Sequence, residues 1–146
     1  MVCAMSDRRI LSIWFPRLGA ERLMRAERGM ETGPLAVVEE RANMQVVSSL
    51  NHAAQAAGIQ TGQPVRDAHA MCGGLVTRAR NAPAEAAFLT ALRRWAGKFS
   101  PWVAEEVPDG LVIDLTGCAH LFGGEETLLG VVETDCAGMG LSVQLG

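Results

Sequence analysis

The sequence has no excess of positive charge. Its 146 residues include 13 lysines and arginines against 16 aspartates and glutamates, which gives a net charge of −3. A protein that binds nucleic acid by itself usually carries a basic excess, because neutralising phosphates supplies most of its affinity. We therefore expect this chain to bind DNA only weakly on its own.

Metal-binding cysteine pairs and long apolar runs are also absent. No two cysteines have the C-x-x-C spacing that is typical of zinc sites. No apolar run is long enough to span a membrane, and the N-terminal residues lack the apolar core of a signal peptide. We therefore expect a cytoplasmic protein with reduced thiols, no metal, no other cofactor and no membrane partner. The four cysteines are Cys3, Cys72, Cys118 and Cys136.

What is present is the composition of an ordinary folded protein. Apolar residues make up 49% of the chain and charged residues 20%. This balance is typical of globular proteins and argues against disorder. The length is sufficient for a hydrophobic core, in one compact domain or two small ones.

Short apolar segments alternate with stretches of helical periodicity. The order predicts an α/β or α+β fold on a mixed sheet, with a charged turn over residues 39–43. The strands over residues 10–15 and 111–115 are the expected centre of the sheet, because both are almost continuously apolar. The other strands are predicted at 34–38, 44–49, 75–78, 103–107 and 141–145, and the helices at 18–28, 52–57, 64–71, 84–99 and 125–136.

Local signals support several of these elements. Asn51 is predicted to cap a short helix that Gly58 ends. The tripeptide from Pro108 to Gly110 is typical of a turn and predicts a hairpin between the strands on either side. The long helix is predicted to present one apolar face, made of Ala84, Ala87, Phe88, Ala91, Leu92 and Trp95.

Four segments occur in the order of four known motifs. They are Ile13–Pro16, Asn51–Ile59, Gly62–Ala68 and Val107–Thr116. Together they resemble the N-terminal region of Y-family (UmuC/DinB-like) translesion DNA polymerases, most closely the catalytically inactive ImuB group. The family has an apolar strand leading into Asp-x-Asp, two motifs in the fingers, and a Ser-Asp-Glu-type motif ahead of Leu-Asp and a Thr or Ser.

The resemblance covers the whole chain and implies its organisation. Residues 8–18 and 80–146 would form a polymerase palm on a mixed sheet, and residues 19–79 a small fingers subdomain. The chain ends inside an apolar strand, so we expect the palm to be truncated before it is complete.

The departures from the family pattern indicate a lost activity. Two-metal phosphoryl transfer needs carboxylates that bridge a pair of Mg²⁺ ions. Trp14 and Pro16 stand where the family has the two aspartates of the first motif. In the later motif Asp109 remains, but Gly110 replaces the glutamate. One carboxylate is therefore left of four, and Mg²⁺ needs several hard oxygen ligands.

The nucleotide-binding positions differ from the family in the same way. Where the family uses a tyrosine and an arginine to contact the triphosphate, this chain has His52 and Gln55. Gly19 stands at the aromatic residue that excludes ribonucleotides. Gln55 is neutral and lacks the forked donors of arginine, so nucleotide binding is expected to be impaired too.

Some of these residues also have purely structural interpretations. Trp14 and Phe15 are expected to fill the space that the metals and base have left, with an exposed partner contact at Trp14 as the alternative. On local grounds, Asp109 is typical of an ordinary turn. A set of basic side chains is interpreted either as a solvated face or as a DNA contact. Its members are Arg78, Arg80, Arg93, Arg94 and Lys98.

The sequence therefore predicts a non-catalytic polymerase-like scaffold in translesion synthesis and SOS mutagenesis. The resemblance implies weak binding to damaged or primer–template DNA. Its other implied partners are a sliding clamp, a RecA-like accessory protein and an error-prone replicative-type polymerase. One alternative is an active Y-family polymerase with rearranged ligands, for which Glu105 and Glu106 are candidates. The other alternative is a generic α/β protein-interaction module.

Overall fold

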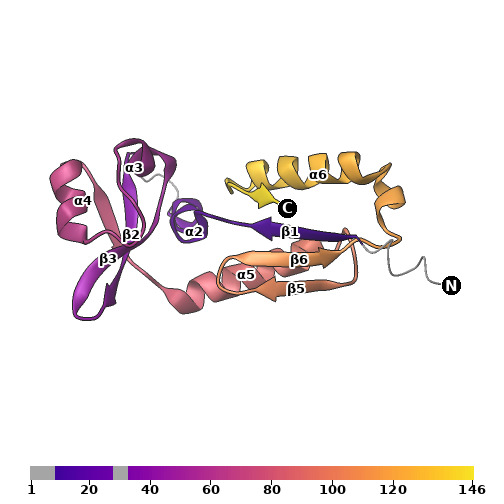
Figure 1. Cartoon of the computed structure of the whole chain (residues 1–146), viewed down its shortest axis with the longest axis horizontal. Coiled ribbons are helices and arrows are strands. Elements are labelled where there is room, and N and C mark those ends of the chain that lie inside the picture. Colours follow the sequence, from indigo (N-terminus) through magenta and orange to yellow (C-terminus); the bar gives the residue numbers. More distant parts are fainter. Residues whose placement is uncertain (1–8, 28–32) are drawn as a thin grey trace. The chain divides into compact units, whose positions relative to one another are not determined.

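The strand β1 (Ile10–Trp14) lies inside a four-stranded sheet with the order β5-β6-β1-β7. It pairs antiparallel with β6 (Gly110–Asp114) and β7 (Gln144–Leu145), and β6 pairs antiparallel with β5 (Val103–Glu106). Figure 1 shows this sheet in the computed structural model, which describes residues 9–27 and 33–146. The two strands expected at the centre of a sheet therefore do lie there.

A second sheet has three strands in the order β3-β2-β4. In it, β2 (Leu35–Arg41) pairs antiparallel with β3 (Met44–Leu50) and parallel with β4 (Val76–Ala79). The predicted α/β fold class is confirmed. The mixed sheet is this smaller one, whereas all described pairs of the larger sheet are antiparallel.

The chain divides into two compact units. Among the described residues, one unit contains those up to Pro16 together with Pro83–Gly146, and the other contains those within Arg17–Ala82. The predicted boundaries near residues 18 and 80 lie close to this division. The assignment of the units to palm and fingers remains a prediction.

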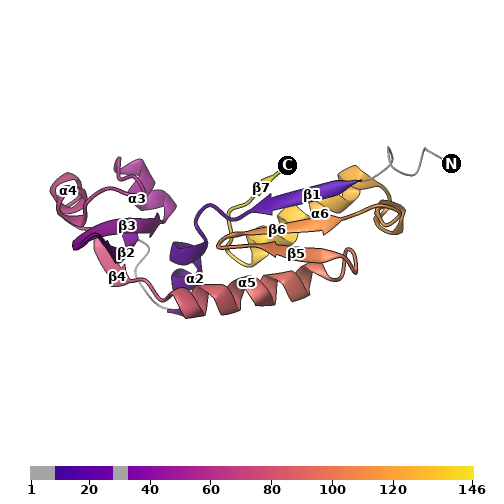
Figure 2. The same cartoon turned by 60° about the horizontal axis from the view of Figure 1, so that its bottom comes forward.

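Two helices cover one face of the four-stranded sheet (Figures 1 and 2). They are α5 (Ala82–Ala96) and α6 (Glu125–Gly138). Between these helices and the sheet lies the core of the first unit. It includes the fully buried side chains of Ile13, Phe15, Leu89, Leu111, Ile113, Leu128 and Val132.

The apolar face predicted for α5 was only partly correct. Leu92 is buried, but Ala87 and Ala91 are exposed, and the buried face runs through Glu85, Leu89, Leu92 and Ala96. Alanines are common on both faces of helices and say little about orientation. The bulky Leu89 has the larger hydrophobic gain and decides which face turns inward.

In the second unit, α2 (Leu18–Ala26), α3 (His52–Ala56) and α4 (Val65–Met71) surround the three-stranded sheet. The predicted cap is present, since the Asn51 side-chain oxygen accepts a hydrogen bond from the Ala54 N–H at 3.0 Å. Gly58 has a φ of +94° and ends α3 as expected. Residue 28 and Gly29, at the predicted end of the first helix, lie outside the described residues.

The charged turn predicted over residues 39–43 was wrong. β2 continues through Arg41, and only Ala42 and Asn43 form the turn, with φ values of 53° and 63°. Positive φ at both central residues is typical of the two-residue hairpin turn that matches strand twist. The predicted strand over 141–145 was also too long, because β7 has two residues. A 3₁₀-helix, η1 (Ala119–Phe122), lies between β6 and α6.

Candidate functional site

The predicted metal-site positions meet at one end of the four-stranded sheet. Trp14 lies directly opposite Gly110 in the β1–β6 ladder. The Trp14 indole Nε1 donates a hydrogen bond to Oδ2 of Asp109 at 3.1 Å. The backbone is fixed at the same place, since the Phe15 N–H donates to the Asp109 carbonyl at 2.9 Å. Trp14, Asp109 and Gly110 are thus close neighbours.

Gly110 sits in tightly packed backbone. A Cβ atom at this position would lie 3.3 Å from the Ile13 carbonyl oxygen and 3.4 Å from Glu106 atoms. Contacts this short to backbone require the neighbours to shift. A side chain at position 110 would therefore need its neighbours to shift by a few tenths of an ångström.

The two aromatic residues of the first motif have different surroundings. Phe15 is fully buried in the core of the first unit, whereas Trp14 is 44% exposed. Trp14 lies at the surface against Asp109, and its filling of space left by metals stays a prediction. Its indole N–H needs a partner once it leaves water, and the carboxylate provides one. Pro16 follows at the end of the strand, half-buried.

Glu105 and Glu106, the candidate replacement metal ligands, lie on opposite faces of the sheet. Glu105 accepts a hydrogen bond from the Thr90 hydroxyl at 3.0 Å and pairs with Arg93 Nε at 3.2 Å, both on α5. Glu106 is exposed and lies opposite Gly110 in the β5–β6 ladder. This arrangement is expected, because successive side chains of a strand point to opposite faces of the sheet. Across residues 9–27 and 33–146, no three His, Cys, Asp or Glu side chains are placed to share a metal ion.

The nucleotide-binding positions predicted from the resemblance lie in the second unit. Gln55 and His52 are exposed on α3, and Gly19 is buried in α2. The sequence reasoning missed Arg17, whose guanidinium donates to the Gln55 side-chain oxygen and to the Leu50 carbonyl at 3.4 Å. Its permanent positive charge and its position directly after Pro16 of the first motif could have identified it from the sequence. A permanent cation thus lies beside the neutral Gln55.

Four of the five predicted DNA-contacting cations are paired with carboxylates. Arg78 lies 3.5 Å from Glu27, and Arg80 lies 2.8 Å from Glu39. Arg93 pairs with Glu105 as described above, and Lys98 pairs with Asp135, while Arg94 is exposed. Each carboxylate offsets the positive charge of its partner, so the paired side chains attract DNA phosphates less strongly. Whether any of the five contacts DNA remains a prediction.

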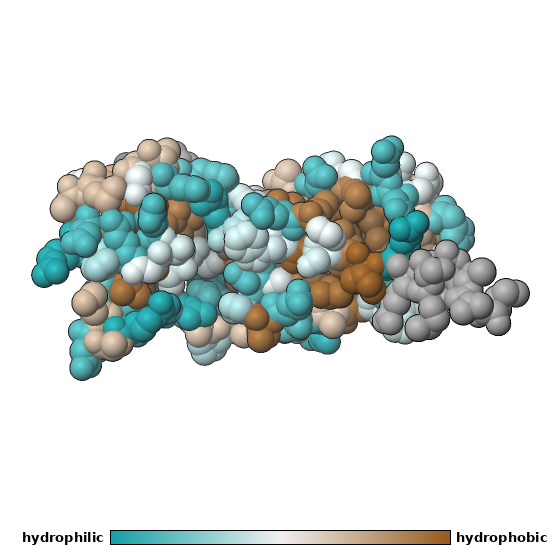
Figure 3. Space-filling view, viewed as in Figure 1, coloured by the Kyte–Doolittle hydropathy of each residue, from teal (hydrophilic) through white to brown (hydrophobic). Residues whose placement is uncertain are grey.

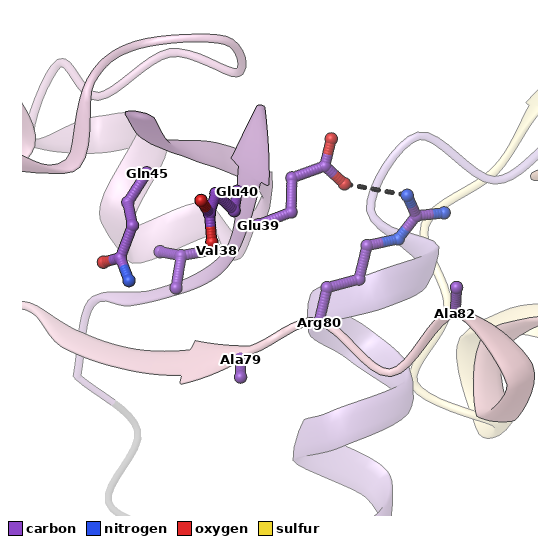
Figure 4. A pocket seen from close by; sticks show the side chains of 7 residues that line it. All are labelled: Val38, Glu39, Glu40, Gln45, Ala79, Arg80 and Ala82. Atoms are coloured by element: carbon purple, nitrogen blue, oxygen red, sulfur yellow. Dashed lines mark hydrogen bonds and ion pairs between the residues drawn. The ribbon is translucent and has the colours of Figure 1, made fainter. Parts of the chain in front are cut away.

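The Arg80 pair lies in a pocket of about 540 Å³ beside β2 and β4 (Figure 4). Glu39 points toward the Arg80 guanidinium in this view, and its carboxylate also binds Arg41. Hydrogen bonds from Arg41 and Arg80 hold the pKa of Glu39 below its ordinary value. The pocket is lined by Val38, Glu39, Glu40, Gln45, Ala79, Arg80 and Ala82.

No helix among the described residues is both long and apolar enough to cross a membrane.

Comparison with solved structures identifies the fold. A post-insertion binary complex of Dbh DNA polymerase matches with a TM-score of 0.79 and 16% sequence identity, over 94% of this chain and 41% of that one. DinB from Sulfolobus solfataricus matches with a TM-score of 0.77, also at 16% identity and over the same shares. At this identity the likeness shows the fold alone, and the chain spans less than half of each polymerase.

Sequence comparison identifies the family. Protein ImuB of Caulobacter vibrioides, in strains NA1000 / CB15N and ATCC 19089, is 44% identical over 72 residues. The aligned segment is 49% of this chain and 16% of that protein. The profile of the impB/mucB/samB family matches residues 13–146. The predicted resemblance to Y-family polymerases is therefore confirmed, and the chain belongs to the impB/mucB/samB family.

Proposed function

We propose that this chain is the palm-and-fingers part of a Y-family polymerase-like protein that has lost catalysis and serves as a scaffold in DNA damage tolerance. The family membership and the similarity to ImuB support a role in that process. The loss of catalysis is an inference from the residues at the metal-site positions.

The hydrogen bond between Trp14 and Asp109 carries this proposal. An indole occupies one ligand position, and it uses the carboxylate that remains at another. Two-metal catalysis needs carboxylates that bridge both ions, and Mg²⁺ accepts few substitutes for oxygen ligands. An indole N–H is a donor only and cannot coordinate a metal.

The scaffold would act in translesion synthesis and SOS mutagenesis in the cytoplasm, with the chemistry supplied by an error-prone replicative-type polymerase. A sliding clamp and a RecA-like accessory protein are the other proposed partners. Affinity for damaged or primer–template DNA would be weak, because the chain carries a net charge of −3.

Primer extension by the full-length protein tests the proposal. We expect no nucleotide incorporation with Mg²⁺, and we expect Asp109→Asn to leave damage-induced mutagenesis in cells unchanged. Incorporation by the wild type that is lost in Asp109→Asn would overturn the proposal.

Incorporation by the wild type that is lost in Asp109→Asn would favour the alternative, an active polymerase with rearranged metal ligands. One observation supports it, because Glu106 lies opposite Gly110 and is therefore on the sheet face that also presents Trp14. Calorimetric titration of Mg²⁺ with a deoxynucleoside triphosphate separates the two. The scaffold predicts no heat of binding by the wild type, and micromolar binding that Glu106→Gln removes would establish the enzyme.

A further inference from the structure

The face of the four-stranded sheet away from α5 and α6 is apolar and open. β1 alternates regularly, with Leu11 and Ile13 buried and with Ile10 and Trp14 exposed at 47% and 44%. Figures 1 and 2 show both helices on the other side of the sheet. Figure 3 shows hydrophobic residues gathered along β1 and beside it. We call this side the open face. Its outward positions on β1, β6 and β5, with the residue before β5, are Ile10, Ser12, Trp14, Trp102, Ala104, Glu106, Gly110, Val112 and Asp114.

The open face contains a hollow next to its most exposed aromatic residue. Trp102 is 63% exposed and stands at the wall of a depression of about 420 Å³. Exposed tryptophan beside an apolar hollow is typical of the residues that dominate protein interfaces. The hollow is lined by Ile10, Pro101, Trp102, Val103, Ala104, Val112 and Asp114.

The charged side chains at the outward positions named above are acidic. Glu106 and Asp114 occupy outward positions, and Asp109 adjoins them at the hairpin turn. None of the outward positions holds a lysine or arginine. Two arginines of the first unit pair with carboxylates elsewhere: Arg9 lies 3.1 Å from Glu125 of α6, and Arg93 binds Glu105 on the helix-covered side.

This combination disfavours DNA and favours a cationic protein partner. Phosphates would meet the carboxylates of Glu106 and Asp109, with no lysine or arginine at any of the outward positions named above, and this opposes binding. A helix with an apolar stripe would fill the hollow, and lysines or arginines beside that stripe would meet the carboxylates. A sheet face offers side chains but no free backbone edge, so strand addition does not apply here.

We propose that the open face is the docking surface for a cationic amphipathic helix of a protein partner. The proposal deepens the scaffold role by naming a surface and a partner chemistry. Its test measures peptide binding and no nucleotide incorporation, so the two proposals fail independently.

The test uses two synthetic helical peptides with the same leucine stripe, one flanked by lysines and the other by glutamates. Binding to the protein is followed by tryptophan fluorescence and by amide chemical-shift mapping. We expect the Leu/Lys peptide to bind at least tenfold more tightly and to shift amides of β5, β6 and β1. Trp102→Ser and Glu106→Lys should each weaken this binding at least fivefold.

Met44→Ser is the matched control, because Met44 is a 49% exposed apolar residue on the other sheet. It should leave binding unchanged, and the melting temperatures of all three variants should stay close to that of the wild type. Equal binding of the two peptides would overturn the proposal. So would shifts at the open face on adding duplex DNA, or self-association that Trp102→Ser abolishes.

Discussion

The indole of Trp14 and the carboxylate of Asp109 form a hydrogen bond of 3.1 Å between residues 95 positions apart in the sequence. The β1–β6 register places them together by pairing Trp14 with Gly110. A carboxylate that accepts an indole N–H is partly satisfied without any cation. The bond thus gives Asp109 a structural role.

Removing the indole donor should therefore reduce stability. Trp14→Phe keeps the ring and loses the N–H, and we expect the free energy of unfolding to fall by about 0.5–1.5 kcal/mol. Urea denaturation measures this difference. Trp102→Phe is the control, since Trp102 is 63% exposed and should tolerate the change with little loss. Equal losses in both variants would mean that the Asp109 bond contributes nothing measurable.

Substitution by alanine should have opposite effects on stability at the tightly packed Gly110 and at the exposed Gly130. Gly110→Ala brings a Cβ to 3.3 Å from the Ile13 carbonyl and should destabilise by about 1–3 kcal/mol. Gly130→Ala should stabilise by about 0.5–1 kcal/mol, because Gly130 is exposed within α6 and its Cβ would meet nothing within 4 Å. Thermal denaturation of both variants checks the prediction. A neutral Gly110→Ala would show that the hairpin relaxes easily, and that a glutamate there is tolerable.

The Asn51 side chain should contribute strongly to the stability of the second unit. This side chain is buried, accepts from the N–H groups of Leu35 and Ala54 at 3.0 Å each, and donates to the Gly33 carbonyl at 2.9 Å. Asn51→Ala leaves these groups without partners and should cost about 2–4 kcal/mol. Chemical denaturation followed by circular dichroism measures the loss. Gln45→Ala, at an exposed position on β3, should change stability by less than about 0.5 kcal/mol.

The pairing of Asp135 predicts a pH dependence. Hydrogen bonds from Lys98 and then Trp95 lower the pKa of Asp135 from its ordinary 3.8. A lowered folded-state pKa stabilises the protein above the ordinary value, and this stabilisation is lost as the pH falls through the folded-state pKa. Wild type should thus be more stable than Asp135→Asn at pH 7, and the difference should shrink below about pH 3.8.

Denaturation curves at several pH values measure that difference. Glu133→Gln serves as the control, because Glu133 is exposed on the same helix. A gap between wild type and Asp135→Asn that stays constant across the acidic range would contradict the ionic origin of the effect.

The cation beside Gln55 should contribute to any residual DNA affinity. Arg17→Ala in the full-length protein should weaken binding to primer–template DNA and reduce the slope of log K against log salt by about one. Fluorescence anisotropy at several salt concentrations gives this slope. Arg66→Ala is the matched control, because the Arg66 side chain is 89% exposed. Identical slopes for Arg17→Ala and wild type would remove Arg17 from the DNA-contacting surface.

The sequence by itself determined the local elements. Continuous apolar residues predicted the two central strands, Asn51 and Gly58 predicted the limits of a short helix, and Pro108–Gly110 predicted the hairpin. Each of these signals acts through the backbone or side chain of neighbouring residues, so no distant contact is needed to read it. The identity of the residues at the predicted metal-site positions was likewise visible before the fold was known.

The tertiary structure alone decided how those residues are used. The Trp14–Asp109 bond depends on a strand register, and the Arg17–Gln55 contact depends on where the fold places α3 relative to Arg17. The inward face of α5 was decided by Leu89, since the alanines around it fit either face. These outcomes depend on contacts between residues far apart in the chain, whose hydrophobic and hydrogen-bond energies outweigh weak local preferences.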